Sequence, residues 1–159
     1  MKCIAAMDPY RVIGFKGKIP WKISAEIKWF KEFTWNNTLI MGLTTFENIP
    51  PLRNRDIVVL TNSISGMSQQ EFYEKHRHKC HKLFIRTDRT FDPQEFPNAI
   101  VAGGAKTYWN MLPYINELYM SYIIDQYEGD CFMPVFEYLF PHSAIHREYK
   151  DFWVVKYWK

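Results

Sequence analysis

Glu26 is the residue whose type and neighbours most suggest chemistry. It follows Pro20-Trp21 in an aromatic-rich segment and lies four residues before Phe30. Helical spacing places Glu26 and Phe30 one turn apart on the same face. On residue types alone, the simpler interpretation is that Glu26 points to solvent and pairs with Lys22. The alternative is a carboxylate in an apolar pocket, with a shifted pKa, that grips an N–C–N group through two hydrogen bonds.

Two turns in which a glycine joins a strand to a helix are candidate anion sites. Gly103-Gly104 follow an apolar segment and precede Lys106, and Gly42 follows another apolar segment and precedes Thr44. Backbone N–H groups at a helix start attract negative charge, and glycine allows a phosphate to approach closely. Each turn alone is as well explained by tight chain reversal, with Thr44 as a helix N-cap. Together, they would bracket the pyrophosphate of a dinucleotide.

Two basic segments offer weaker signals. Arg55 lies just before an apolar strand and could bind a carboxylate in a bidentate pair, although a solvated loop arginine is the simpler interpretation. The segment 76–82 holds three histidines and Cys80. We predict a solvated connection there and no metal, because a structural metal site needs a second ligand pair at a set spacing.

The composition is that of one globular domain covering residues 1–159. The chain is 47% apolar and 18% aromatic, and some aromatics are expected to line a site for a flat ligand. A net charge of +3 from 20 basic and 17 acidic residues is too small and too mixed to indicate nucleic acid binding. Cys3, Cys80 and Cys131 form no framework and are interpreted as reduced thiols of a cytoplasmic protein. No apolar stretch approaches the length of a membrane span.

The elements that must position these residues alternate between strand and helix. The predicted strands are Cys3–Met7, Thr38–Met41, Ile57–Leu60, Lys82–Arg86, Ala99–Ala102, Glu117–Ile124 and Phe152–Trp158. The predicted helices are a segment N-capped by Ser24 that runs to about Thr34, then Thr44–Asn48, Ser68–His78 and Lys106–Leu112, and Asp8–Lys18 is predicted to be a loop. This order predicts a single-domain α/β fold: a predominantly parallel central sheet flanked by helices, with an antiparallel C-terminal edge. Ligands bind such sheets at the carboxyl ends of the strands.

With these motifs in order, the chain resembles the dihydrofolate reductase family over nearly its whole length. The resemblance rests on Val12-Ile13-Gly14, Ile19-Pro20-Trp21, the Glu26–Phe30 segment, Leu39 to Gly42, Thr45 to Ile49, Val101 to Tyr108, Leu112-Pro113 and Glu128-Gly129-Asp130. At Glu26, the resemblance favours the carboxylate in an apolar pocket over the solvent-exposed pair with Lys22. It implies a monomeric cytoplasmic oxidoreductase that reduces dihydrofolate to tetrahydrofolate with NADPH for one-carbon metabolism, is a target of antifolate inhibitors, and has no nucleic acid or membrane partner.

The resemblance also implies roles for individual residues. Glu26 would bind the pterin and assist protonation of its N5, Ser121 would bond that carboxylate and a water, and Trp21 would hold another water. The implied substrate wall, including the arginine that binds the glutamate tail, is Ile4, Ala6, Ile27, Phe30, Ile49, Leu52 and Arg55. The implied cofactor contacts are Ala6, Ile13, Gly14, Ile19, Gly42, Thr44, Thr45, Thr61, Arg86, Ala102, Gly103, Gly104, Ala105, Lys106, Thr107 and Tyr108. The family pattern further implies a cis bond between Gly103 and Gly104 and a mobile lid from Pro9 to Ile19.

The chain departs from the family pattern in ways that bear on the cofactor. Leu43 stands where many members carry an arginine that contacts the adenosine phosphates, and we predict that Arg86 compensates, with a contribution from Lys106. Ala102 replaces a bulkier apolar residue, Ala105 replaces a third glycine, and Ile19 stands where bacterial members often have Met or Leu.

Two rival interpretations differ in class. One is a reductase of the same fold that acts on a ribosylated pyrimidine in riboflavin synthesis, which would lack the Pro20-Trp21 pair and the helical acid. The other is a nucleotide-binding or structural module without activity, which would be favoured if Glu26 and Ser121 pointed outward.

Overall fold

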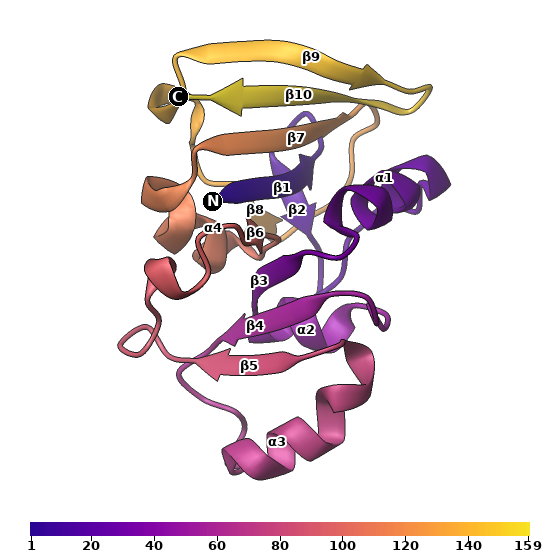
Figure 1. Cartoon of the computed structure of the whole chain (residues 1–159). Coiled ribbons are helices and arrows are strands. Elements are labelled where there is room, and N and C mark those ends of the chain that lie inside the picture. Colours follow the sequence, from indigo (N-terminus) through magenta and orange to yellow (C-terminus); the bar gives the residue numbers. More distant parts are fainter.

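An eight-stranded sheet forms the centre of the computed structural model, which describes all 159 residues (Figure 1). Its strands are β1 (Lys2–Met7), β3 (Thr38–Gly42), β4 (Asp56–Leu60), β5 (Leu83–Arg86), β6 (Ile100–Val101), β7 (Glu117–Ile123), β9 (His142–Glu148) and β10 (Phe152–Trp158). Their order in space is β5-β4-β3-β6-β1-β7-β10-β9. In this spatial order, each of the first six strands, β5 through β7, pairs in parallel with its neighbours among them. The last two strands are antiparallel: β10 to β7, and β9 to β10. The predicted fold class is therefore confirmed.

Alternating side chains of the strands build an apolar cluster on each face of the sheet. Ile4, Leu39, Met41, Ile57 and Val59 belong to the first cluster. Their sequence neighbours on β1, β3 and β4 belong to the second. A strand buried on both faces must be apolar throughout, which is why these strands read as continuous apolar runs.

The helices divide between the two faces. They are α1 (Ser24–Thr34), α2 (Leu43–Asn48), α3 (Gln69–His76) and α4 (Ala105–Met111). Trp29 of α1, Phe46 of α2 and Phe72 of α3 pack into the first cluster. Tyr108 and Met111 of α4 pack into the second. No helix combines the length and apolar character needed to cross a membrane.

Helix starts differ from expectation at two residues. The cap of α1 is Ile23, and Ser24 is the first helical residue with no capping hydrogen bond, so the predicted N-cap is wrong. The cap of α2 is Gly42, and Thr44 lies inside the helix without capping it. At Ser68, in contrast, a capping box with Glu71 starts α3, because an acidic residue stands at the third helical position.

Three strands lie where the sequence did not predict them. The predicted loop Asp8–Lys18 contains β2 (Val12–Gly14), which pairs antiparallel with β8 (Cys131–Phe132) in a separate two-stranded sheet. The third is β9, whose residues are all exposed and lack an apolar alternation.

Candidate active site

Glu26 projects from the first turn of α1 into an apolar setting. It is half-buried, and desolvation raises the pKa of its carboxyl group to about 7. It forms no ion pair and no hydrogen bond with another side chain, so the simpler interpretation, in which it pairs with Lys22, is wrong. A half-buried carboxyl group without a protein partner is available to a ligand.

Two further polar groups lie on the same side of the sheet without partners. Trp21 is 6% exposed and Ser121 is fully buried, and neither the indole Nε1 nor the hydroxyl Oγ has a hydrogen-bond partner. Ser121 lies two residues from both Tyr119 and Ile123 on β7, so its side chain shares their face of the sheet. Tyr119 and Ile123 are members of the cluster that α1 covers. Buried polar groups are normally satisfied, so these two atoms mark a place for water or a ligand.

Most of the expected substrate wall is gathered in this first cluster. Ile4 and Leu52 are members of it, and Ala6, Phe30 and Ile49 pack against it. The cluster also brings together Trp21 and Ala102. The sheet and α1 thus bring residues from distant parts of the sequence to one apolar surface.

Two expected ligand contacts are large apolar side chains that remain exposed. Ile27, next to Glu26, is 45% exposed, and Ile19, two residues before Trp21, is 61% exposed. Neither belongs to the cluster. Both side chains are therefore free to contact a ligand.

The two glycine turns interlock at the carboxyl ends of β3 and β6. The N–H of Gly42 donates to the carbonyl oxygen of Gly103 at 2.8 Å, and the bond between Gly103 and Gly104 is cis, as predicted. A Cβ atom on Gly42 would lie 3.0 Å from Oγ1 of Thr107, and one on Gly104 would lie 3.3 Å from Oγ1 of Thr45. A larger residue at either position would therefore require the facing threonine to shift by a few tenths of an ångström.

The same turns offer unpaired backbone donors. Neither α2 nor α4 has a side-chain cap, so the first N–H groups of both helices stay available to an anion. Thr44 and Lys106 are exposed beside them, and Thr45 and Ala105 are partly exposed. These features fit the pyrophosphate of a dinucleotide.

Tyr108 connects the turn to the centre of the sheet. Its hydroxyl donates to the carbonyl oxygen of Ile4 at 2.9 Å. Tyr108 is a member of the second cluster, and Ile13, which was expected beside it, packs against that cluster. These two residues therefore lie on the opposite face from Phe30 and Ile49, with β1 between them.

The arginines expected to bind ligand make more hydrogen bonds within the protein than the sequence indicated. Arg55 is only 5% exposed; its Nε donates to Oγ1 of Thr34 at 3.2 Å and its Nη2 to the carbonyl oxygen of Lys31. Nη1 has no protein partner and is free for a carboxylate. The simpler interpretation of Arg55 as a solvated loop residue is therefore wrong.

Arg86, at the end of β5, is also paired. Its Nη2 lies 2.6 Å from Oε1 of Glu95, which offsets the charge expected to compensate for Leu43. The backbone N–H of Thr61 donates to the carbonyl oxygen of Arg86 at 3.0 Å, so both residues lie at the same edge.

Asp8, which directly precedes the expected lid, is a structural residue that the sequence analysis did not single out. It is buried, and its Oδ1 accepts from the N–H groups of Tyr10 and Val12 while its Oδ2 accepts from that of Tyr127, at 2.8–3.0 Å. An acidic residue directly after an apolar strand and before Pro9 is the signal that could have revealed it. Asp8 therefore ties the start of the expected lid to the 124–130 segment.

A second tie holds the expected lid further along the chain. The N–H of Lys16 donates to Oδ2 of Asp130 at 3.1 Å, and the N–H of Asp130 donates to the carbonyl oxygen of Gly14 at 3.0 Å.

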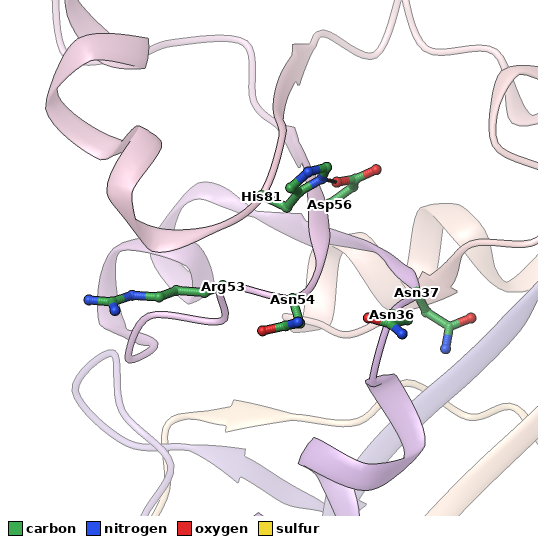
Figure 2. Close-up of a pocket in the computed structure, with 6 residues that line it drawn as sticks. All are labelled: Asn36, Asn37, Arg53, Asn54, Asp56 and His81. Carbon is green, nitrogen blue, oxygen red and sulfur yellow. Dashed lines mark hydrogen bonds and ion pairs between the residues drawn. The ribbon is translucent and has the colours of Figure 1, made fainter.

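A polar depression of about 340 Å³ lies elsewhere, beyond the end of α1. Figure 2 shows His81 and Asp56 turned toward each other in it, with Nδ1 and Oδ1 2.9 Å apart, while Arg53 points away. No hydrophobic residue lines it, so it does not suit a flat ring. No group of three or more His, Cys, Asp or Glu side chains is placed to hold a metal ion.

Comparisons with known proteins agree with this geometry. A family model described as dihydrofolate reductase matches residues 1–151. The chain is 33% identical over 145 residues to the dihydrofolate reductase of Buchnera aphidicola subsp. Acyrthosiphon pisum, covering 87% of this chain and 81% of that protein. It is 37% identical over 134 residues to the dihydrofolate reductase type A13 of Escherichia coli, covering 83% of this chain and 76% of that protein.

A solved structure shares the fold. It is a dihydrofolate reductase from Enterococcus faecalis complexed with NADP(H) and RAB-propyl. It superimposes with a TM-score of 0.73 at 24% identity, covering 99% of this chain and 94% of that one.

Proposed function

Because this chain belongs to the dihydrofolate reductase family, we propose that it reduces 7,8-dihydrofolate to 5,6,7,8-tetrahydrofolate with NADPH. The observation that carries the proposal is the unpaired carboxyl group of Glu26, held at a pKa of about 7 on an apolar face. Ala102, which directly precedes Gly103 of the interlocked turns, packs against the same apolar cluster. A nucleotide-binding or structural module would have no use for such a group.

NADPH fits the site because the interlocked turns leave uncapped N–H groups for its pyrophosphate. In this assignment Gly42, Thr45, Gly104 and Thr107 hold the pyrophosphate. When bound, the cofactor supplies the hydride that is added to C6 of the pterin. Ala6, Ile13 and Tyr108 keep the ring that carries the hydride near the centre of the sheet. Bringing reacting carbons to roughly 3–3.5 Å supplies much of the rate.

Glu26 orients the substrate and assists the proton step. As a carboxylate it accepts hydrogen bonds from the 2-amino group and the adjacent ring nitrogen. Its negative charge favours the N5-protonated form, with water as the immediate donor, and a pKa near 7 lets the group exchange a proton at neutral pH. The unpartnered Oγ of Ser121 bonds this carboxylate and a water, and the unpartnered Nε1 of Trp21 holds a second water.

Ile4, Ala6, Ile27, Phe30, Ile49 and Leu52 form the walls for the pterin and benzoyl rings in this assignment. The free Nη1 of Arg55 binds a carboxylate of the glutamate tail. The lid, held by Asp8 and Asp130, excludes water and so strengthens the electrostatics of the site. The proposal extends to a monomeric cytoplasmic enzyme that also binds antifolate inhibitors.

The decisive experiment follows the loss of NADPH absorbance with dihydrofolate, for the purified chain and for Glu26→Gln. We expect the variant to lose most of the activity, with the largest loss at neutral pH and above, where a solution proton is scarce. Glu32→Gln is the matched control, because Glu32 is exposed on the same helix and only approaches Lys28 at 3.8 Å. An inactive wild-type chain, or full activity of Glu26→Gln, would refute the proposal.

A diaminopyrimidine antifolate separates this function from that of a ribosylated-pyrimidine reductase of the same fold. Its N–C–N edge requires the carboxylate of Glu26. Binding by the wild-type chain and loss of binding in Glu26→Gln is the expected pattern.

A further inference from the structure

The guanidinium group of Arg86 is held in a fork by Glu95. Nη2 donates to Oε1 at 2.6 Å and Nε donates to Oε2 at 3.3 Å, while Nη1 donates to the carbonyl oxygen of Ile85 at 3.0 Å. The rings of Phe84 and Phe96 lie 5.6 and 5.9 Å from the guanidinium carbon. The hydrogen bonds from Arg86 hold the pKa of Glu95 below its usual range, so this carboxylate is ionised at neutral pH. Arg86 is thus fixed and largely neutralised.

This pair lies in line with the glycine turns. Gly42 is the register partner of Leu60, and Leu60 is the register partner of Arg86. Two strand spacings, about 10 Å, therefore separate Gly42 from Arg86 along the carboxyl edge of the sheet. Figure 1 shows β3, β4 and β5 side by side on this half of the molecule.

The path of a bound dinucleotide follows from this order. Its pyrophosphate lies at the β3 and β6 turns, and its hydride-bearing ring lies toward β1 in the proposed function, on which this inference rests. The other nucleoside must then extend in the opposite direction, over β4 and β5. Its ribose reaches the edge where Thr61 and Arg86 meet.

The charged side chains near this edge are of both signs, with Arg86 and the exposed Arg89 positive and Asp88 and Glu95 negative. Leu43, the first residue of α2, provides no charge. The carboxylate of Asp88 accepts from Nδ2 of Asn62 at 2.8 Å, which adds a negative charge beside the same strand ends. A ribose 2′-phosphate approaching Arg86 would meet the Glu95 carboxylate, whereas a ribose 2′-hydroxyl could donate a hydrogen bond to it.

We propose that Glu95 determines the dinucleotide preference of this chain: by occupying the donors of Arg86, it weakens binding of a 2′-phosphorylated dinucleotide relative to one with a free 2′-hydroxyl. Glu95 is a specificity-determining residue that acts through Arg86. NADPH remains a cofactor, but its advantage over NADH is smaller than an unpaired Arg86 would give.

The test measures dissociation constants for NADPH and NADH from the quenching of tryptophan fluorescence, without substrate. Glu95→Gln is expected to tighten NADPH binding about fivefold, the scale of one exposed ion pair, and to change NADH binding less than twofold. Arg86→Ala should weaken NADPH selectively. Adding Glu95→Gln to Arg86→Ala should then change little, since the two act as a unit.

Glu74→Gln is the matched control for net charge, because Glu74 lies near the C-terminal end of α3, before the start of β5, and pairs with Arg77 just after that helix. It should leave both constants unchanged. Equal tightening of both dinucleotides by Glu95→Gln, no change, or weaker NADPH binding would overturn the inference. Failure of the proposed function has a different signature, in which the wild-type chain binds neither dinucleotide.

Discussion

A carboxyl group with a pKa of about 7 changes charge within the range in which most enzymes work. At Glu26 the cause is desolvation alone, because no neighbouring charge contributes. The group is thus poised by its apolar surroundings and not by a partner, which leaves both oxygens for a ligand.

This pKa makes folding stability depend on pH in a predictable direction. The unfolded chain ionises Glu26 near its ordinary pKa of 4.5, whereas the folded chain holds the proton up to about 7. Between these values the folded state binds more protons, so this contribution to stability is complete below pH 4.5 and is lost as pH rises through 7. Glu26→Gln removes the ionisation and should therefore stabilise the protein at pH 8, by at most roughly 3 kcal/mol, and have little effect at pH 4.

Urea denaturation of both proteins at pH 4 and pH 8 provides the measurement. Glu32→Gln should show no such difference, since Glu32 is exposed. An equal effect of Glu26→Gln at the two pH values would mean that the carboxyl group is not desolvated.

For single residues, the sequence predicted which residues belong to the site better than it predicted which atoms they contact. The spacing of Glu26 and Phe30 indicated a shared face, but it could not tell whether that face was covered. Arg55 read as a loop residue, because its contacts with Lys31 and Thr34 come from residues more than twenty positions away. The pairing of Arg86 with Glu95 follows no helical or strand spacing, so nothing in the sequence marked it.

At the level of elements, Asp8 ties the start of the proposed lid, residues 9–19, to Tyr127. Asp8→Asn keeps the size of the side chain but replaces one acceptor oxygen with an NH2 group. A donor would then face the N–H of Tyr10 and Val12 or that of Tyr127. A buried donor left unsatisfied costs about 1–3 kcal/mol, so we expect a loss of stability in that range and reduced activity.

Amide hydrogen exchange distinguishes this local effect from general destabilisation. The N–H of Tyr127 should exchange faster in Asp8→Asn, while those of β4 should change only with global stability. Asp130→Asn is the comparison, since the exposed Asp130 side chain accepts a single hydrogen bond, from Lys16. Unaltered exchange at Tyr127 would show that the lid is held by other contacts.

The elements that the sequence predicted well are those buried on both faces. Continuous apolar runs such as Ile57–Leu60 leave few alternatives to a parallel strand. β9 was missed because it is an exposed edge strand, whose backbone pairing with β10 holds it without an apolar pattern. β2 and β8 were missed because two or three residues are too short to show a period, and their pairing joins segments more than one hundred residues apart.

At the scale of the whole molecule, the site depends on a sheet order that the sequence does not contain. β6 is only two residues long, yet it lies between β3 and β1 and so brings the two glycine turns into contact. Ser121 reaches the α1 face only because β7 pairs with β1. The resemblance to a family predicted this convergence, whereas periodicity predicted only the separate elements.

A ligand that spans this sheet order should stabilise the entire fold. NADPH would contact turns after β3 and β6 and the edge of β4 and β5, all of which separate on unfolding. A ligand that binds only the folded state adds about 1.4 kcal/mol for each tenfold rise in concentration above its dissociation constant. In a chain of this length, 1 kcal/mol raises Tm by roughly 2–4 °C. We therefore expect Tm to rise about 3–6 °C for each tenfold increase in NADPH concentration once binding is established, as measured by calorimetry or dye fluorescence.

Adenosine monophosphate has no pyrophosphate to fill the interlocked turns and should give a smaller rise at equal concentration. A Tm that stays constant from micromolar to millimolar NADPH would contradict a dinucleotide site at this edge, since no binding to the folded state could then be present.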